Sequence, residues 1–119
     1  YLTAADRDNR RVADRFDVLS TPILRALRMV AAKGHAAGRS VTLCGEIGGR
    51  PLEAMALVGL GYRALSMSAA SVGPVKAAIM AMDAAEVTRF VEEAMDARDG
   101  APSLREKLRA YADAKGVPL

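Results

Sequence analysis

The sequence predicts an α/β fold, on three observations. Short apolar runs at residues 41–44 and 64–68 are typical of strands, and the segments around them carry apolar residues at helical spacing. The connection over residues 45–63 includes a predicted helix, which favours a parallel βαβ unit with a right-handed crossover. After residue 83 the pattern is helical alone.

The first predicted helix begins at Ser20 or Thr21, because either side chain can cap a helix and Pro22 suits its first turn. Gly38 is expected to end it. The apolar residues at helical spacing are Ile23, Leu24, Leu27, Val30 and Ala31.

Residues 41–44 form a short apolar run that is typical of a buried strand, and it ends at the only cysteine, Cys44. A glycine-rich turn follows. Pro51 then suits the first position of a second helix, which we expect to run to about Leu60 and to end at Gly61.

The second predicted strand, residues 64–68, leads into a third helix. We expect Ser71 to cap this helix, with Pro74 in its first turn. Its inward positions are Val75, Ile79 and Met82.

Two further helices complete the pattern. Residues 83–86 resemble a capping box and open the first of them, which residues 99–102 end. Residues 103–106 open the last helix, and Gly116 ends it. The inward positions of the two helices are Val87, Phe90, Val91, Ala94 and Met95, and then Leu108, Tyr111 and Ala112.

Two strands do not make a stable parallel sheet by themselves, because such sheets are wider and covered on both faces. Either other chains complete the sheet, or further strands precede Tyr1. We therefore expect residues 1–119 to be a single partial domain of a longer protein. Uncovered strand edges and apolar helix faces also favour a homo-oligomer.

The composition argues against several classes of protein. The 119 residues are 51% hydrophobic, which argues against disorder, and the net charge of +3 comes without a basic run interleaved with aromatic residues, so no nucleic-acid partner is expected. No apolar run is long enough for a membrane span, and the start is not a signal peptide. A single cysteine fits a reducing cytoplasmic location.

Cys44 lies where parallel α/β folds place their chemistry, at the carboxyl end of a strand. A thiol there, near the carboxylate of Glu46, can act as a proton donor or as a nucleophile. The free thiol has a reference pKa of about 8.5, so both protonation states are accessible near neutral pH. The alternative is a small buried apolar residue.

Three segments carry a resemblance, in matching order and spacing: Ala5–Asn9, Val41–Gly49 and Leu65–Ser68. Together they resemble the phosphotransferase-system enzyme I family of phosphoenolpyruvate–protein phosphotransferases, most closely its nitrogen-related branch. The resemblance covers nearly the whole chain.

The resemblance implies the C-terminal fragment of a (β/α)8 TIM barrel, comprising its last two strands with their helices, plus the C-terminal helices. In that family the barrel binds phosphoenolpyruvate and Mg²⁺. The phosphoryl group passes to a histidine and on to a histidine phosphocarrier protein, and pyruvate is released. The family's metal ligands and its phosphorylated histidine precede Tyr1, so we expect no metal ligand here and an inactive fragment.

The resemblance also assigns roles to residues. Cys44 matches the catalytic cysteine, and Arg7 matches the arginine that contacts phosphoenolpyruvate, which suits a guanidinium that can hold a carboxylate or phosphate with two hydrogen bonds. Asp6 and Asn9 are expected to fix the loop that presents Arg7. Glu46 either orients the turn after Cys44 or is an ordinary exposed acid. The alternative for Arg7 is a surface ion pair with a neighbouring aspartate.

Some positions depart from the family pattern or have weaker assignments. Asp8 stands where glycine is common, and Arg50 replaces an acid that could cap the following helix. Ser66 and Ser68 could line the floor of the site or form turns. His35 is expected to be a surface group near a helix C-terminus, because it is the only histidine and lacks a ligand partner at metal-binding spacing.

Two alternative functions remain. Another phosphoenolpyruvate-using enzyme of the pyruvate phosphate dikinase type shares the barrel. A non-catalytic helical interaction module would explain the shortage of strands, but it would leave the Cys44 turn without a purpose.

Overall fold

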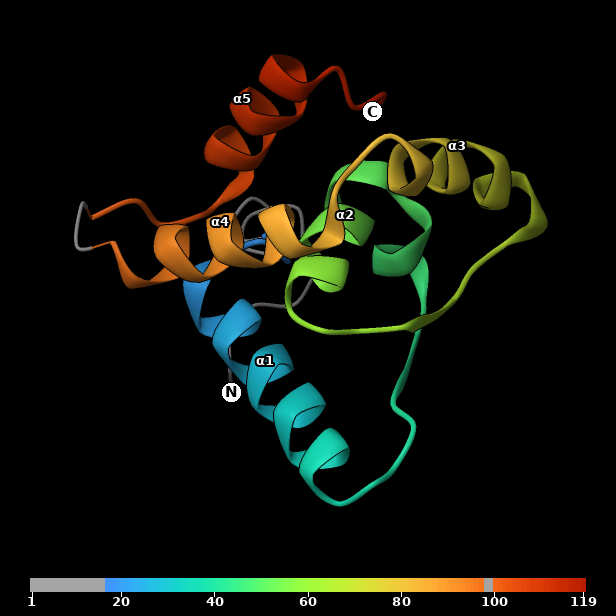
Figure 1. The fold of residues 1–119 in the computed structure, drawn as a ribbon, viewed down its shortest axis with the longest axis vertical. Helices are drawn as coiled ribbons and strands as arrows, with labels where there is room; N and C mark the ends of the chain where they lie inside the picture. The colour runs from blue at the N-terminus through green and yellow to red at the C-terminus, as the bar shows by residue number, and fades with distance from the viewer. Residues whose placement is uncertain (1–16, 98–99) are drawn as a thin grey trace, which may run out of the picture.

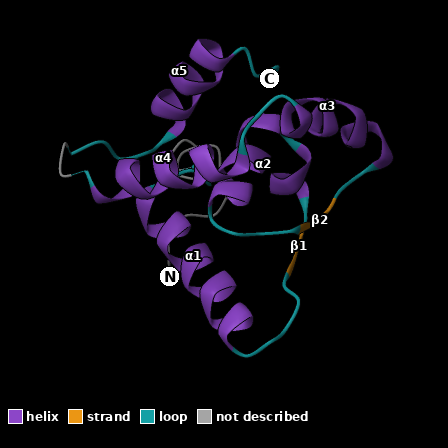
Figure 2. Cartoon of the chain, in the orientation of Figure 1, coloured by secondary structure: helices purple, strands orange, loops and turns teal. Residues whose placement is uncertain are grey.

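The computed structural model describes residues 17–97 and 100–119. Within them the fold is mixed α/β and mostly helical, with two short strands on one side of the molecule (Figures 1 and 2). In chain order the elements are α1 (Thr21–Ala36), β1 (Thr42–Cys44), the 3-10 helix η2 (Glu46–Gly49), α2 (Pro51–Gly59), β2 (Ala64–Ser66), α3 (Ala69–Met80), α4 (Ala84–Asp96) and α5 (Arg105–Lys115).

The predicted βαβ unit is confirmed. Strands β1 and β2 pair in parallel, with the register Thr42↔Ala64, Leu43↔Leu65 and Cys44↔Ser66. Helix α2 lies between them in the chain, as the residue pattern predicted. In the part of the chain that the structure describes, no helix is both long and apolar enough to cross a membrane.

The prediction that residues 41–44 form a buried strand is wrong for the described structure. Thr42 and Cys44 are exposed, whereas Leu43 is half-buried. A strand is covered on both faces only when elements pack against each of them. Here η2 packs against one face, where Gly48 approaches both Leu43 and Leu65, and the described residues leave the other face open.

The start of α3 also differs from the prediction. The helix begins at Ala69, with Ser68 in the N-cap position, so Ser71 lies inside the first turn and is not the cap. The two serine hydroxyls lie 3.0 Å apart and share a hydrogen bond. Pro74 therefore lies in the second turn of α3, inside the helix, where it cannot donate the usual hydrogen bond to the carbonyl four residues before it.

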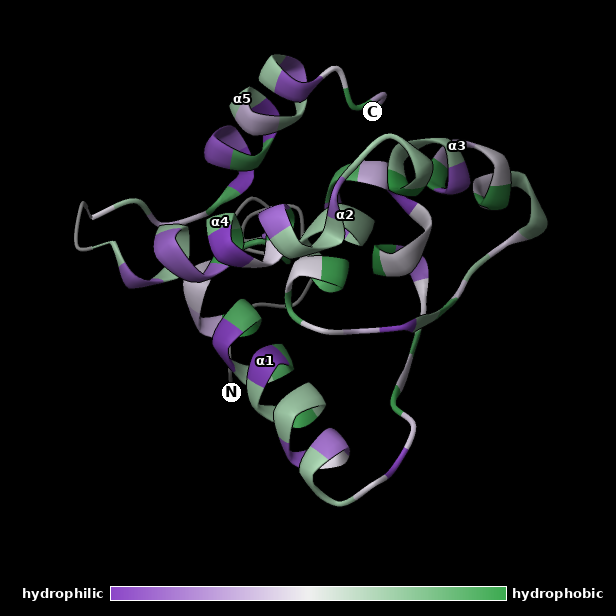
Figure 3. Ribbon diagram, in the orientation of Figure 1, coloured by the Kyte–Doolittle hydropathy of each residue, from purple (hydrophilic) through white to green (hydrophobic). Residues whose placement is uncertain are grey.

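The core is centred on α2, which is buried from Leu52 to its last residue, Gly59. Most of α2 is coloured as apolar in Figure 3, whereas α5 carries polar residues over much of its visible surface. Helix α4 packs closely on α2 at Gly59, where an added Cβ would come within 2.7 Å of a methyl group of Val91. The other fully buried large side chains include Leu19, Leu24, Val87, Met95, Leu104 and Leu108.

The predicted start of α4 and the predicted end of α5 are confirmed. The carboxylate of Asp83 accepts a hydrogen bond from the N–H of Glu86 at 2.9 Å, as in a capping box. Gly116 ends α5 in the left-handed conformation, with φ of 67°.

Replacing Gly59 with alanine should destabilise the 119-residue chain by about 1–2 kcal/mol, because the new methyl group would overlap the stiff β-branched side chain of Val91. Urea unfolding followed by circular dichroism measures the change. The matched control is Gly73→Ala in α3, where nothing lies within 4 Å of the added Cβ. This control should be stabilised by about 0.5–1 kcal/mol through helix propensity. Equal effects of the two substitutions would show that Gly59 is not a close-packing position.

Candidate functional site

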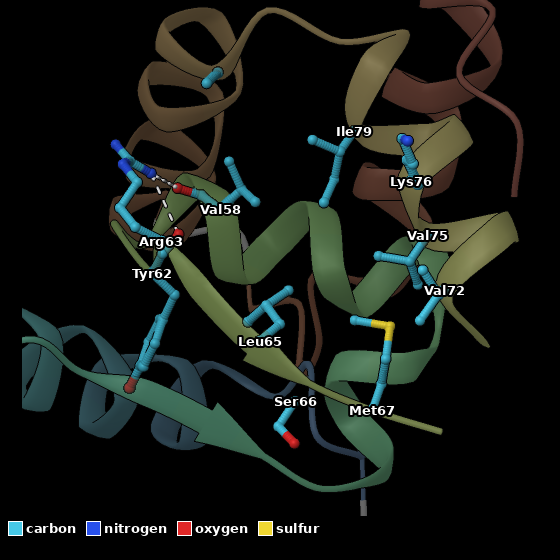
Figure 4. Close-up of a pocket in the computed structure, with 11 residues that line it drawn as sticks. Val58, Tyr62, Arg63, Leu65, Ser66, Met67, Val72, Val75, Lys76 and Ile79 are labelled. Carbon is cyan, nitrogen blue, oxygen red and sulfur yellow. Dashed lines mark hydrogen bonds between the residues drawn. The ribbon is translucent and has the colours of Figure 1, made fainter. Parts of the chain in front are cut away.

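The candidate site lies at the carboxyl ends of β1 and β2, where Cys44 is the register partner of Ser66. Because side chains alternate along a strand, these two residues share one face, and Leu43 and Leu65 share the other. Figure 4 shows Leu65 pointing toward α2 and Ser66 pointing away from it. Cys44 and Ser66 are both exposed, so the thiol is accessible on the open face of the sheet.

The turn after Cys44 depends on Gly45. Its φ of 124° and ψ of −179° lie in a region that residues with a Cβ rarely adopt. The N–H of Gly48 then donates to the carbonyl of Gly45 at 3.2 Å and closes η2. This compact turn connects the cysteine directly to Pro51, the first residue of α2.

A hollow of about 420 Å³ opens just beyond the two strand ends. The segment after β1 contributes Gly45, Glu46, Gly49 and Arg50 to its lining. The end of β2, the turn after it and the start of α3 contribute Ser66, Met67, Ser68 and Ser71. The predicted strand-end serines, Ser66 and Ser68, therefore do line this hollow. Its lining includes three serines, one acidic side chain and one basic side chain.

The described structure gives the two charged rim residues different surroundings. The carboxylate of Glu46 is exposed and has no hydrogen-bond partner among residues 17–97 and 100–119, so its orienting role stays a prediction. Arg50 makes no side-chain cap to α2, and instead one of its guanidinium nitrogens lies 3.9 Å from the carboxylate of Glu53. The expected loss of capping at Arg50 agrees with this geometry.

Three predicted site residues, Asp6, Arg7 and Asn9, lie outside the described residues. Within the described part of the chain, no three His, Cys, Asp or Glu side chains gather as a metal site. His35 is exposed in the last turn of α1, as expected for a surface histidine.

A cluster of charged side chains at the start of α2 was not predicted from the sequence. The guanidinium of Arg105 donates to Asp17 at 2.8 Å and to Glu53 at 3.0 Å, and the hydroxyl of Ser103 donates to Asp17 at 2.6 Å. Glu53 is the only charged residue buried among the described residues, at 2% exposure. The glutamate in the otherwise apolar segment 51–60 was the signal that could have revealed a buried ion pair.

The ion pairs of this cluster connect three parts of the chain near the candidate site. Asp17 precedes α1, Arg105 opens α5, and Glu53 lies in the first turn of α2. Glu53 is two residues beyond Pro51, so the cluster fixes the end of α2 that carries the turn after Cys44. Removing one partner of such a buried pair leaves an uncompensated charge, which is strongly destabilising.

Asp17 should make folding stability sensitive to acid. Burial raises its pKa, but hydrogen bonds from Arg105, Ser103 and the N–H of Leu19 outweigh that effect and leave the pKa below the ordinary value of 3.8. A carboxyl whose folded pKa is depressed stabilises the fold above its unfolded pKa and loses this contribution as the pH falls through the folded value. We expect Asp17→Asn to reduce the free energy of unfolding at pH 7 by about 1 kcal/mol. The difference from the parent chain should shrink progressively below pH 3.8 in urea titrations. A difference that stays constant with pH would contradict this assignment.

The exposure of Cys44 predicts its reactivity toward a thiol reagent. Because it is the only cysteine, one equivalent of a disulfide reagent such as dithionitrobenzoate should react with the folded chain. The rate should be similar in folded and urea-unfolded protein. A thiol that reacts only after unfolding would show that Cys44 is enclosed.

Comparison with known proteins gives a consistent result. Residues 1–84 match the model of the family described as PEP-utilising enzyme, PEP-binding domain. The chain is 37% identical over 117 residues, 98% of its length, to a protein of Escherichia coli K12 named phosphoenolpyruvate-dependent phosphotransferase system. It is also 35% identical over 96 residues, 81% of its length, to the phosphoenolpyruvate-protein phosphotransferase of Listeria monocytogenes.

A third relative, multiphosphoryl transfer protein 2 of Escherichia coli, is 39% identical over 98 residues, which is 82% of this chain and 12% of that protein. The chain spans only 16% and 17% of the lengths of the first two relatives. The family match covers the whole candidate site, including Cys44, the turn after it and both strands. The chain therefore belongs to the PEP-binding domain family of phosphoenolpyruvate-utilising enzymes.

Proposed function

We propose that this chain is the C-terminal part of the phosphoenolpyruvate-binding domain of a phosphoenolpyruvate–protein phosphotransferase. The observation that carries the proposal is the placement of Cys44, exposed at the carboxyl end of β1 and beside the end of β2. The names of the two relatives, both phosphoenolpyruvate-dependent phosphotransferases, support the activity.

The proposal includes a (β/α)8 barrel, of which residues 1–119 are a partial domain carrying the last two strands. In the described residues β1 and β2 pair only with each other, so each has one open edge. A groove of about 820 Å³ lies beside β2, lined mainly by apolar side chains of α2, α3 and β2 (Figure 4). Further strands and helices of a barrel would continue from these edges and cover the groove.

The proposed reaction moves the phosphoryl group of phosphoenolpyruvate to a histidine elsewhere in the protein, and from there to a phosphocarrier protein. The bond between phosphorus and the enol oxygen breaks, which leaves the enolate of pyruvate. Cys44 then gives its thiol proton to the methylene carbon of the enolate, and pyruvate forms. The resulting thiolate recovers a proton from solvent. In the reverse direction the thiolate removes a proton from pyruvate.

Arg7 would hold the carboxylate or phosphate of the substrate through two parallel hydrogen bonds, and Asp6 and Asn9 would hold the loop that presents it. Glu46, on the rim of the hollow beyond Cys44, would orient the turn. These four roles rest on the matched sequence segments.

A magnesium ion would supply charge neutralisation for the phosphoryl group. The described residues do not fit such an ion, because they contain no group of three potential ligands. Glu46 is the only acidic side chain that lines the hollow. The metal ligands would therefore lie outside the described residues.

The proposal extends to partners and location: a histidine phosphocarrier protein, a homo-oligomeric assembly and the cytoplasm, with neither nucleic acid nor membrane as partner. The described surface carries several exposed large apolar side chains, among them Val72 and Met80, which support contact with further protein. A pyruvate phosphate dikinase type of enzyme and a helical interaction module gain no support from a specific described feature.

In the full-length protein, Cys44→Ala should lower pyruvate formation by about 10²–10⁴-fold while leaving phosphoenolpyruvate binding nearly unchanged, because general acid–base groups contribute in this range. A coupled assay of pyruvate and calorimetric binding of phosphoenolpyruvate measure the two effects separately.

The matched control is Thr42→Ala, which changes an exposed residue on the same face of β1, two positions before the cysteine. It should retain both turnover and binding. Parallel loss of binding and turnover in Cys44→Ala would mean that the cysteine supports the fold and transfers no proton.

A further inference from the structure

A second hollow, of about 480 Å³, lies at the opposite end of the strands from Cys44. It is bounded by α1, by α4 and by the connection from α2 to β2. Arg63, one of its lining residues, immediately precedes β2, whereas Ser66 ends that strand at the candidate site. The second hollow is therefore separate from the site already described.

Four cationic or titratable basic side chains line this hollow: Arg25, Arg28, Arg63 and His35. They come from two faces of the hollow, three from α1 and one from the chain after α2. The acidic lining residue is Glu92 of α4, so the local charge is strongly positive. In the described part of the chain, none of the three arginines lies within ion-pair distance of a carboxylate.

Two of the arginines are oriented by backbone carbonyls. One terminal nitrogen of Arg63 donates to the carbonyls of Val58 and Tyr62, at 3.2 and 3.3 Å, near the C-terminal end of α2. One terminal nitrogen of Arg25 lies 3.5 Å from the carbonyl of Met95, near the C-terminal end of α4. Carbonyls at helix C-termini attract cations, so these contacts fix the arginine side chains without neutralising them.

The other guanidinium donors of Arg25 and Arg63 have no partner among the described residues, and the guanidinium of Arg28 makes no hydrogen bond to them. Like charges brought together repel one another, and the neighbouring carbonyls offset only part of that cost. An anion with several oxygens would satisfy the free guanidinium donors and remove the repulsion. A lone surface arginine can donate to water, but three arginines that line one hollow can donate together to the oxygens of one anion.

We propose that the hollow between α1, α4 and the α2–β2 connection binds a compact polyanion that carries phosphate or several carboxylate groups. Arg28 and the free nitrogens of Arg63 and Arg25 donate to its oxygens. His35 borders the site, where its Cε1 atom would lie 3.6 Å from a Cβ added at Gly61. The negative charge of Glu92 repels the ligand and weakens its binding. The site is distinct from the proposed phosphoenolpyruvate site and does not depend on it.

The test titrates the 119-residue chain with pyrophosphate and, separately, with citrate at constant ionic strength, using two-dimensional amide NMR spectra. His35 is the only histidine, so its ring protons provide a single unambiguous reporter. Saturable shifts at His35, Gly61 and Arg63 support the proposal. The ligand with the higher affinity identifies phosphate or carboxylate as the preferred group. Shifts that are absent, or that spread evenly over the surface, overturn the proposal.

Two substitutions that change the charge of the hollow should change the anion affinity in opposite directions. Arg28→Gln should weaken binding by about tenfold through loss of charge-assisted hydrogen bonds, whereas Glu92→Gln should strengthen it severalfold. The matched control is Arg109→Gln, an exposed arginine on α5 that does not line the hollow. Equal weakening by Arg28→Gln and Arg109→Gln would reveal non-specific attraction to net charge and would overturn the site. Weaker binding in Glu92→Gln would overturn it as well.

Discussion

The burial of α2 is the constraint on which the rest of the described structure depends. Its residues from Leu52 to Gly59 are buried, with α3, α4 and α5 packed around it. A helix that is apolar on all sides has no stable position except inside the protein. Because α2 follows Cys44 through a single short turn, fixing this helix also fixes the end of β1.

Glu53, the one charged residue of α2, helps to fix the orientation of this buried helix. Apolar packing alone tolerates some rotation and sliding of a helix, since it is non-directional. The contacts from Arg105 to Glu53 and Asp17 are directional and partly enclosed, so they define how the first turn of α2 faces α5 and the segment before α1. In this way a residue distant from Cys44 in sequence helps to determine where the thiol lies.

The local elements could be predicted from the sequence because each has its own signals. Helix periodicity, the capping aspartate at residue 83 and the glycine at 116 gave the correct order and nearly correct bounds. The position of Cys44 at the end of a strand followed from the position of the apolar run. Two features could not be predicted in this way. The exposure of β1, including Cys44, depends on which elements cover the sheet, and the Arg105 cluster joins residues that are far apart in the chain.

Two incomplete surfaces of the described structure have a common explanation under the proposed barrel. Proton transfer to an enolate carbon requires a site from which bulk water is largely excluded, yet the face that carries Cys44 is open. The apolar groove beside β2 is also open, although burying its side chains would stabilise the protein. The two features adjoin at the end of β2: Leu65 lines the groove, and Ser66, which shares the face of Cys44, lines both the groove and the hollow beyond the strand ends. A wall of further strands, with helices outside it, would enclose the thiol and cover the groove at once, which no single docking helix would achieve.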